Sequence, residues 1–113
     1  MPLDLFAGIP VVDYDRALDW YERLLGAAPS FLPNATEAVW EVAEHRYLYI
    51  EVRPADAGHA MQTLFVDDLD SWVEGIAARG IEAAQTETYG NGVRKATYYD
   101  PDGNEIGLGG APV

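Results

Sequence analysis

Three residues on one predicted strand carry the side chains in this sequence that are best suited to chemistry. In the segment YLYIEV, Tyr47, Tyr49 and Glu51 alternate with apolar residues, so they share one face of a strand. Beside an aromatic wall, Glu51 could pair with the cation of a ligand or act as a general base. An ordinary solvated carboxylate at the end of a strand is the alternative that the sequence leaves open.

The two histidines lie in predicted connections between strands. His45 is in the turn 44–46, and His59 is in a loop two residues before Met61. Strand parity places His59 on the face of Met61, so a metal-binding role stays open for it, although we favour a solvated loop histidine. The chain has no cysteine, which excludes disulfides, thiolate metal sites and cysteine nucleophiles.

No other catalytic motif is present in the sequence. There is no G-x-S-x-G elbow, no phosphate-binding loop and no G-x-G-x-x-G, and the segment 90–92 is typical of a turn. Arg94 could bind a ligand carboxylate or pair with the side chain of Asp100, and we favour the pairing with Asp100.

The charge of the chain excludes one class of partner. Seven basic residues stand against nineteen acidic ones, giving a net charge of -12, whereas a nucleic-acid binder needs clustered Lys and Arg. The acidity favours solubility, and it would also attract a cationic ligand. The sequence contains no apolar run long enough to span a membrane and no basic-then-apolar leader, so we expect a cytoplasmic protein without a membrane partner.

Helix and strand signals occur twice along the chain. In the first half, Asp13 is a predicted N-cap, apolar residues then recur at helical spacing, and Gly26 ends the helix. In the second half, Asp67 and Asp68 begin a helix that ends at Gly80. The predicted strands are Leu3–Val12, Pro29–Leu32, Ala38–Val42, Tyr47–Val52, Met61–Val66, Ile81–Thr86, Arg94–Tyr99 and Glu105–Gly109.

These two halves are copies of one pattern. The stretches VVDYDRALDWYERLLG and FVDDLDSWVEGIAARG match at an offset of about 55 residues, and no linker separates the halves. The sequence therefore predicts an α+β fold of two tandem βαβββ modules, about residues 1–55 and 60–113, in a single domain that spans residues 1–113.

The repeated pattern resembles the vicinal oxygen chelate superfamily, which includes glyoxalases, extradiol dioxygenases and bleomycin resistance proteins. The resemblance is carried by VVDYDRALDWYERLLG and by the late turn DPDGN, and it covers nearly the whole chain. It implies that each module curls into a half-barrel and that two modules enclose a cleft. For a chain of this length it also implies a homodimer in which the modules of two chains complete each cavity.

Metal-dependent members of that superfamily carry four ligands on inward-facing strand positions. The resemblance places these positions at Phe6, Glu51, Met61 and Gly107. Phenylalanine and glycine cannot ligate a metal through their side chains, and a thioether is too soft for the divalent ions of this superfamily. Because one carboxylate is not a site, we expect no metal and no cofactor.

The turn DPDGN is followed by a glycine-rich strand. Pro101 presets a turn dihedral and Gly103 permits a positive φ, so we expect the fold itself to need this turn. Gly107 and Gly109 remove side chains from the predicted cavity wall. They leave room for a flat or bulky ligand, or they allow close packing of the backbone, and both interpretations stay open.

The predicted inward-facing positions form an aromatic pocket that carries one acid. Pockets for drug-sized ligands have this character, and aromatic faces stack on planar groups and attract cations. A closed core filled by the same side chains is the alternative. The expected ligand-binding residues are Phe6, Trp40, Tyr47, Tyr49, Glu51, Met61, Phe65, Tyr98 and Gly107, of which Trp40 and Tyr98 rest on the weakest parity argument.

Together these features favour a metal-free binding protein, similar in type to bleomycin resistance proteins. It would sequester an aromatic or cationic natural product in a dimer cleft, with antibiotic resistance as its role. One alternative is an enzyme. It could be an isomerase, lyase or dioxygenase that uses a metal held by Glu51, His59 and a further donor, or a metal-free enzyme that uses Glu51 and a tyrosine as acid and base. Another is a partner-binding or structural dimer whose cavity is closed by Phe6, Tyr49 and Phe65.

Overall fold

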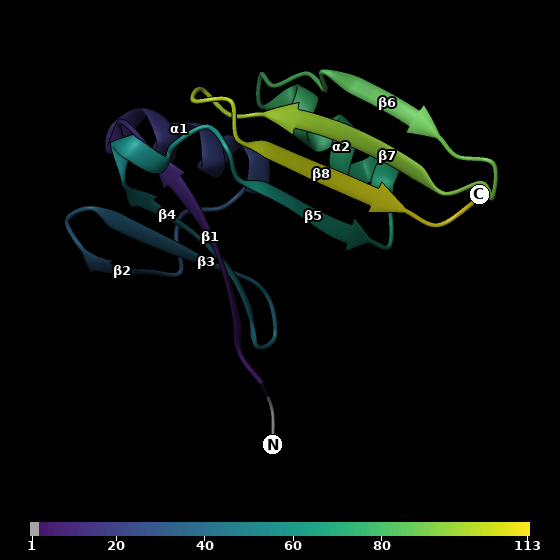
Figure 1. Cartoon of the computed structure of the whole chain (residues 1–113). Coiled ribbons are helices and arrows are strands. Elements are labelled where there is room, and N and C mark those ends of the chain that lie inside the picture. Colours follow the sequence, from purple (N-terminus) through teal and green to yellow (C-terminus); the bar gives the residue numbers. More distant parts are fainter. Residues whose placement is uncertain (1–2) are drawn as a thin grey trace.

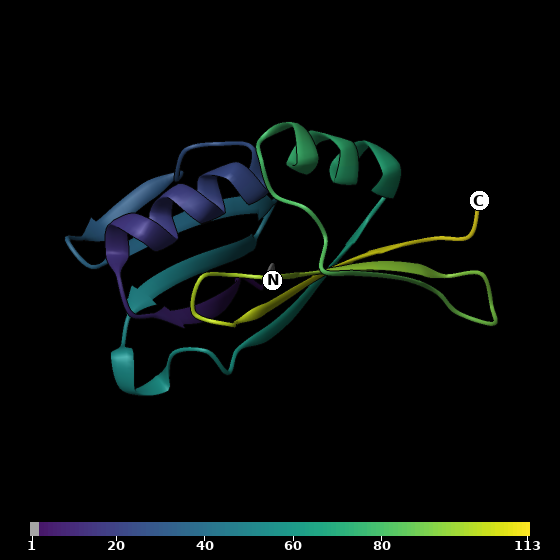
Figure 2. The same ribbon diagram turned by 90° about the horizontal axis from the view of Figure 1, so that it is seen from above.

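Two four-stranded sheets, with their helices on the same side, make up the protein (Figures 1 and 2). The computed structural model describes residues 3–113. Each sheet comes from one half of the chain and joins one parallel pair of strands to antiparallel neighbours. This arrangement confirms the predicted α+β fold of two βαβββ modules.

The first module contains an edge strand followed by a capped helix. Pro10 is tolerated in the first strand because that strand pairs on one side only. The Asp13 carboxylate accepts a hydrogen bond from the Arg16 amide at 2.9 Å, and Gly26, at φ 74°, ends the helix. The elements are β1 (Leu5–Val11), α1 (Tyr14–Leu25), β2 (Phe31–Asn34), β3 (Glu37–Ala43) and β4 (Arg46–Val52), with strand order β1-β4-β3-β2.

The second module repeats this plan after a single helical turn, η1 (Pro54–Asp56). Asp68 caps its helix by accepting a hydrogen bond from the Ser71 amide at 3.1 Å, and Gly80, at φ 92°, follows the helix end. The elements are β5 (Met61–Val66), α2 (Leu69–Ala78), β6 (Gln85–Thr88), β7 (Arg94–Tyr99) and β8 (Glu105–Gly110), with strand order β5-β8-β7-β6.

Two predicted strands are displaced. The sequence predicts a strand at Pro29–Leu32, whereas β2 covers Phe31–Asn34. The sequence predicts a strand at Ile81–Thr86, whereas β6 begins only at Gln85. The Ile81 amide donates to the carbonyl of Ile76, which closes the end of α2, and the Ile81 side chain is buried in the core. Residues 81–83 therefore connect the helix to the sheet, and contact with β7 begins where the Ala84 amide donates to the Thr97 carbonyl at 2.8 Å.

The core lies between the helices and the sheets and is continuous across both modules. Alternate residues of the central strands point toward the helices and are buried, such as Leu48 and Ile50 in β4 and Ile106 and Leu108 in β8. Burying one such side chain contributes roughly 1.5–3 kcal/mol relative to leaving it exposed. Among residues 3–113, neither helix packs on the opposite side of its sheet (Figure 2).

The predicted turn after β7 is the centre of a buried hydrogen-bond network. Asp100 accepts from the amides of Asp102 and Asn104, both at 2.9 Å. The fully buried Asn104 side chain accepts from the amides of Gly58 and Ala60 at 3.0 Å and donates to the Pro10 carbonyl at 2.8 Å. The turn therefore holds three separate segments of the chain together, which explains why its residues are so specific.

Two further contacts join the modules. The Asp102 carboxylate accepts from the Val12 amide at 3.0 Å and from the Arg16 guanidinium at 2.8 Å, so the turn also clamps the start of α1. On the helix side, Arg79 donates to the carbonyls of Arg23 and Leu24 at the end of α1. A cation beside these otherwise unpaired carbonyls is favourable.

Tyr21 causes the fold to lose stability at alkaline pH. Its hydroxyl donates to Asp100 at 2.8 Å, and burial together with the adjacent Asp100 charge raises the pKa of Tyr21 well above its usual range. The unfolded chain ionises this phenol near pH 10 but the folded chain does not. The contribution of Tyr21 to the free energy of unfolding is therefore complete below about pH 10. Above that pH it falls by about 1.4 kcal/mol per pH unit.

Replacing this tyrosine tests the linkage. We expect Tyr21→Phe to lower the free energy of unfolding by about 1–2 kcal/mol at pH 8, because a bond to a charged acceptor is lost. Above pH 10, urea unfolding of the variant should show a shallower loss of stability than the wild type. Tyr99→Phe, at a half-exposed tyrosine, is the control and should keep the wild-type slope. Equal slopes for Tyr21→Phe and the wild type would contradict this role.

Candidate functional site

The first uncovered surface is the side of the β1-β4 pair that faces away from α1. The strand register places Phe6 beside Tyr47, Gly8 beside Tyr49 and Pro10 beside Glu51. We call this surface, together with the neighbouring β3 residues Glu37, Val39 and Glu41, the first open face. The predicted grouping of Phe6, Tyr47, Tyr49 and Glu51 on one face agrees with this register.

Aromatic rings form a continuous cluster on the first open face. The rings of Phe6 and Tyr47 stack with centroids 4.4 Å apart and an interplanar angle of 11°. Phe31 meets Tyr47 edge-on at 6.4 Å, and Tyr49 meets Phe6 edge-on at the same distance. Phe6 and Phe31 are 49% and 46% exposed, so the cluster offers ring surface to a ligand.

Carboxylates surround this aromatic cluster. Glu41 lies opposite Tyr47, and Glu37 lies opposite Glu51 across the β3-β4 pair. Desolvation, and then the negative charges of Glu41 and Asp4, raise the pKa of Tyr47 above its ordinary value. The first open face is therefore negatively charged around neutral aromatic rings, an environment that attracts a cation.

A pocket of about 330 Å³ lies at one end of the first open face. Glu51 is partly exposed there, and its carboxylate is 3.6 Å from the guanidinium of Arg53. At Gly8 a Cβ atom would lie 2.7 Å from the ring of Tyr49, so the missing side chain lets that ring lie across β1. The lining residues are Gly8, Ile9, Pro10, Tyr49, Glu51, Arg53 and Asp56.

The second uncovered surface is the corresponding side of the second sheet. Met61 and Phe65 are 69% and 65% exposed there, which agrees with their predicted orientation. Lys95 and Glu105 also lie on this side, since they alternate with buried residues of β7 and β8. We define the second open face as Met61, Thr63, Phe65, Lys95, Thr97, Tyr99, Glu105, Gly107 and Gly109.

The glycines of β8 are covered by side chains of the same chain. A Cβ atom at Gly107 would lie 2.6 Å from Cε of Lys95, and one at Gly109 would lie 3.0 Å from the ring of Phe65. The sequence left open that these glycines make room for a ligand or allow close packing of the backbone. Neither interpretation describes this packing, because the space above the glycines holds a lysine and an aromatic side chain. Lys95 and Glu105 were not among the predicted site residues, although strand parity places both on the side opposite the buried residues of their strands.

Two predicted ligand-binding residues lie on the wrong side of their sheets. Trp40 pairs with Leu48 and Tyr98 pairs with Ile106, so both point toward the helices. They are only 2% and 1% exposed, and the Trp40 indole donates to the Ala27 carbonyl at 2.9 Å. Their placement in the cleft was wrong because both are core residues.

The four positions that the resemblance assigns to metal ligands do not form a donor set here. Phe6 and Met61 are apolar, Gly107 has no side chain, and Glu51 is the only hard donor of the four. Within residues 3–113, no three His, Cys, Asp or Glu side chains gather closely enough to hold a metal ion. The residues present therefore do not fit the metal that the resemblance implies.

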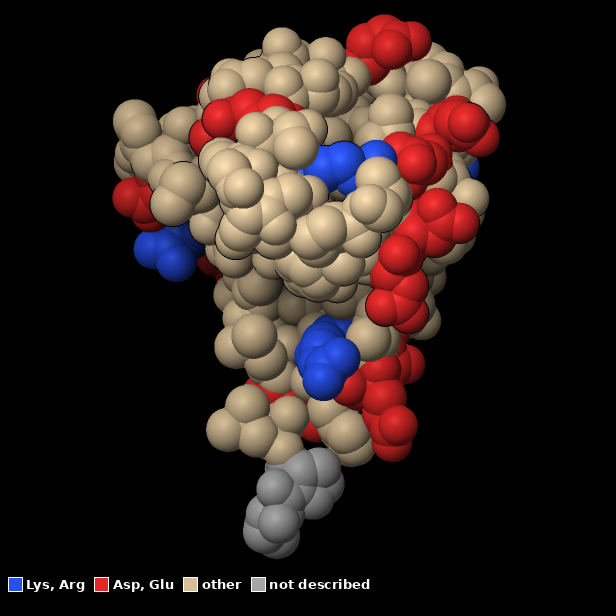
Figure 3. Space-filling model, turned by 90° about the vertical axis from the view of Figure 1, so that its right-hand side faces the viewer, with Lys and Arg blue, Asp and Glu red and all other residues tan. Residues whose placement is uncertain are grey.

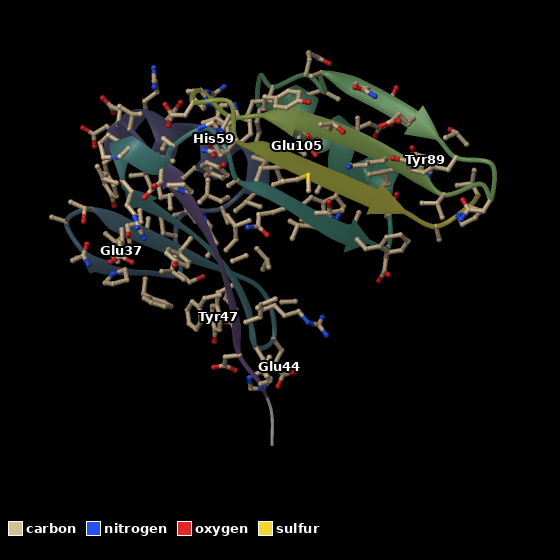
Figure 4. All side chains as sticks on the ribbon, in the orientation of Figure 1. Glu37, Glu44, Tyr47, His59, Tyr89 and Glu105 are labelled. Carbon is tan, nitrogen blue, oxygen red and sulfur yellow. The ribbon has the colours of Figure 1, made fainter. Side chains whose placement is uncertain are left out.

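The two histidines and Arg94 do not take part in the aromatic cluster. The His45 imidazole is 2.6 Å from the carboxylate of Asp4, and His59 is exposed before β5 (Figure 4). The Arg94 guanidinium donates to Asp70 at 2.8 Å, so its predicted pairing with Asp100 was wrong. Figure 4 also shows Tyr47 and Glu105 well apart, on different sheets.

Acidic side chains gather along one edge of the molecule (Figure 3). Figure 3 shows Asp and Glu in a column along one edge of the molecule, with few Lys and Arg side chains in view. Among the residues that the structure describes, none of the helices is long and apolar enough to cross a membrane.

The fold and the sequence agree with one family of known proteins. A family model described as the Glyoxalase/Bleomycin resistance protein/Dioxygenase superfamily matches residues 3–108. A glyoxalase / bleomycin resistance protein from Catenulispora acidiphila DSM 44928 is 59% identical, with a TM-score of 0.96 over 98% of this chain and 100% of the other. No curated protein matches the sequence.

More distant structures share the fold at lower identity. A bleomycin-binding protein in complex with bleomycin is 23% identical, with a TM-score of 0.78 over 96% of this chain and 98% of that chain. An antibiotic binding protein from Streptomyces sp. CB03234 is 24% identical, with a TM-score of 0.72 over 100% and 98% of the two chains. The family match over most of its length shows that this chain belongs to the Glyoxalase/Bleomycin resistance protein/Dioxygenase superfamily.

Proposed function

We propose that the protein is a metal-free binding protein that holds a planar aromatic cation against the first open face, in a cleft between two copies of the chain. The observation that carries this proposal is the exposed Phe6–Tyr47 stack at 4.4 Å, which lies among Glu37, Glu41 and Glu51. Stacking on an exposed ring contributes about 1–3 kcal/mol per planar group, and cation–π attraction adds to it.

A second copy is the proposed cover for both open faces. Phe6, Met61 and Phe65 are 49%, 69% and 65% exposed, and they lie on the two open faces. A large exposed apolar surface of this kind marks an interaction site. A two-fold dimer that sets the first open face of one chain against the second open face of the other would cover both and leave a cleft between them.

The proposed biological role is sequestration of an antibiotic or a similar natural product. Distant structures with the same fold include a protein in complex with bleomycin and an antibiotic binding protein. The net charge of -12 would attract a cationic compound of this kind. Phe6 and Phe65 are about half or more exposed in the single chain, so one chain does not close the cavity by itself.

No observation favours the enzymatic alternative for this chain. A lactoylglutathione lyase from Agrobacterium tumefaciens shares the fold at 17% identity and a TM-score of 0.76, over 95% of this chain and 92% of that chain. The four metal positions here offer one carboxylate, and the Arg53 guanidinium lies 3.6 Å from it. That proximity favours a role for Glu51 as a charge partner.

Calorimetric titration with proflavine, a planar aromatic cation, tests the role of the carboxylates. We expect saturable binding to the wild type and about tenfold weaker binding to Glu51→Gln, because a charge-assisted contact is lost. Glu44→Gln, at an exposed carboxylate in the β3-β4 turn, is the matched control and should bind like the wild type. Equal losses in both variants, or no loss in Glu51→Gln, would contradict the proposal.

Gly8 offers a separate test of the aromatic surface. We expect Gly8→Ala to push the Tyr49 ring off β1, since the added Cβ would lie 2.7 Å from ring atoms. Proflavine affinity should fall by about fivefold, the equivalent of one aromatic contact of roughly 1 kcal/mol. The control is Gly90→Ala, where the added Cβ would meet nothing within 4 Å. Unchanged affinity in Gly8→Ala would remove Tyr49 from the proposed site.

A further inference from the structure

Lys95 is the single lysine of the chain, and it lies on the second open face. In the strand register it stands opposite Gly109 of β8 and Glu87 of β6. Its side chain is 23% exposed, although lysines are most often well solvated on protein surfaces. The position therefore places the ammonium within the proposed cleft and not at its outer rim.

The lysine side chain reaches diagonally over β8. A Cβ atom at Gly107 would be 2.6 Å from Cε and 3.4 Å from Nζ of Lys95, and 3.2 Å from the hydroxyl of Thr63. The ammonium therefore occupies the space into which a side chain at position 107 would project. The resemblance places the last metal ligand of related proteins at this position, so a single positive charge lies close to where those proteins hold a cation.

The ammonium has unused hydrogen-bonding capacity. Its nearest carboxylate is that of Glu105, with Nζ and Oε2 3.7 Å apart, which is longer than a hydrogen bond. A lysine ammonium has three donors, so Nζ can still donate to a ligand oxygen. An oxygen anion that entered the cleft above Gly107 would find these donors already positioned.

We infer that Lys95 binds a carboxylate group of the small molecule held in the cleft. The inference rests on the proposed function and deepens it, since the first open face suits the planar cationic part of a ligand and Lys95 suits an anionic oxygen. The two open faces together then select a zwitterionic aromatic compound. Glu105 sets the strength of this interaction, because its carboxylate competes with the ligand for the same ammonium.

Because Lys95 is the only lysine, ¹³Cε-lysine labelling gives one side-chain NMR signal that reports on this site alone. The labelled protein is titrated with naphthalene-2-carboxylate and with naphthalene-2-carboxamide, which has the same rings without the charge. We expect the carboxylate to shift the Lys95 signal and to bind about tenfold more tightly than the amide, the gain typical of a charge-assisted hydrogen bond.

Variants separate this role from a structural one. Lys95→Met keeps the length of the side chain and should abolish the preference for the carboxylate, measured by calorimetry. Glu105→Gln should instead strengthen carboxylate binding about threefold, an effect in the opposite direction that loss of folding cannot produce. Asp19→Asn, which removes an exposed acid on α1, is the control and should leave both affinities unchanged.

The inference is overturned if the amide and the carboxylate bind equally, if neither binds, or if the Lys95 signal does not move. Proflavine binding keeps this failure distinct from failure of the proposed function. A protein that binds proflavine but shows no carboxylate preference would retain the proposed function and lose the role of Lys95. A protein that prefers the carboxylate but does not bind proflavine would keep an anion site and lose the proposed cation site.

Discussion

Asn104→Ala is expected to lower the free energy of unfolding by about 4 kcal/mol or more. The substitution removes a fully buried side chain that accepts from the Gly58 and Ala60 amides and donates to the Pro10 carbonyl. Each buried polar group left without a partner costs about 1–3 kcal/mol. A loss of this size is a large part of the stability of a small domain.

Urea unfolding at pH 7 measures this effect. The matched control is Asn91→Ala, because Asn91 is an exposed turn residue whose side chain accepts one hydrogen bond, from the Val93 amide at 3.1 Å. It should cost about 1 kcal/mol or less. If the two variants were equally stable, Asn104 would not be the residue that holds the segments together, and the specificity of the DPDGN turn would need another explanation.

Tyr47→Ala is expected to weaken proflavine binding by about thirtyfold. Tyr47 is central to the aromatic cluster, since it stacks on Phe6 and meets Phe31 edge-on. Its removal takes away one stacking surface and loosens the ring beside it, a combined loss of about 2 kcal/mol. The free energy of unfolding should change little by comparison, because the ring lies outside the core.

Two variants define the cause of this loss. Tyr47→Phe keeps the ring and should bind proflavine within about twofold of the wild type, since stacking does not use the hydroxyl. Tyr89→Ala removes an exposed tyrosine in the β6-β7 loop, far from the cluster (Figure 4), and should have no effect. A thirtyfold loss in Tyr89→Ala, or an unchanged affinity in Tyr47→Ala, would show that proflavine binds elsewhere.

The features of the fold that depend on local sequence could be predicted. Asp13 and Gly26 set the ends of α1, because capping is decided by residues within one helical turn. The bounds of β5 and β7 were confirmed, since each is a strand-forming run between clear turn signals. The start of β6 was misplaced because Ile81 has strand propensity but is recruited by the core next to α2.

The features that depend on tertiary contacts were harder to predict. Trp40 and Tyr98 look like ligand-binding aromatics, yet only the strand register shows that both face the helices. The Asn104 network joins residues up to 94 positions apart, so no local pattern reveals its partners. Lys95 could have been placed by alternation along β7, but its position over Gly107 follows from the packing of two strands.

Titration of proflavine and of neutral acridine into protein treated with EDTA tests the proposed function most directly. Acridine has the same three rings without the positive charge at pH 8. A metal-free site for planar cations predicts saturable proflavine binding that EDTA does not change and that is about tenfold tighter than acridine binding. Equal binding of the two compounds, or proflavine binding that is lost with EDTA and restored by a divalent metal, would contradict it.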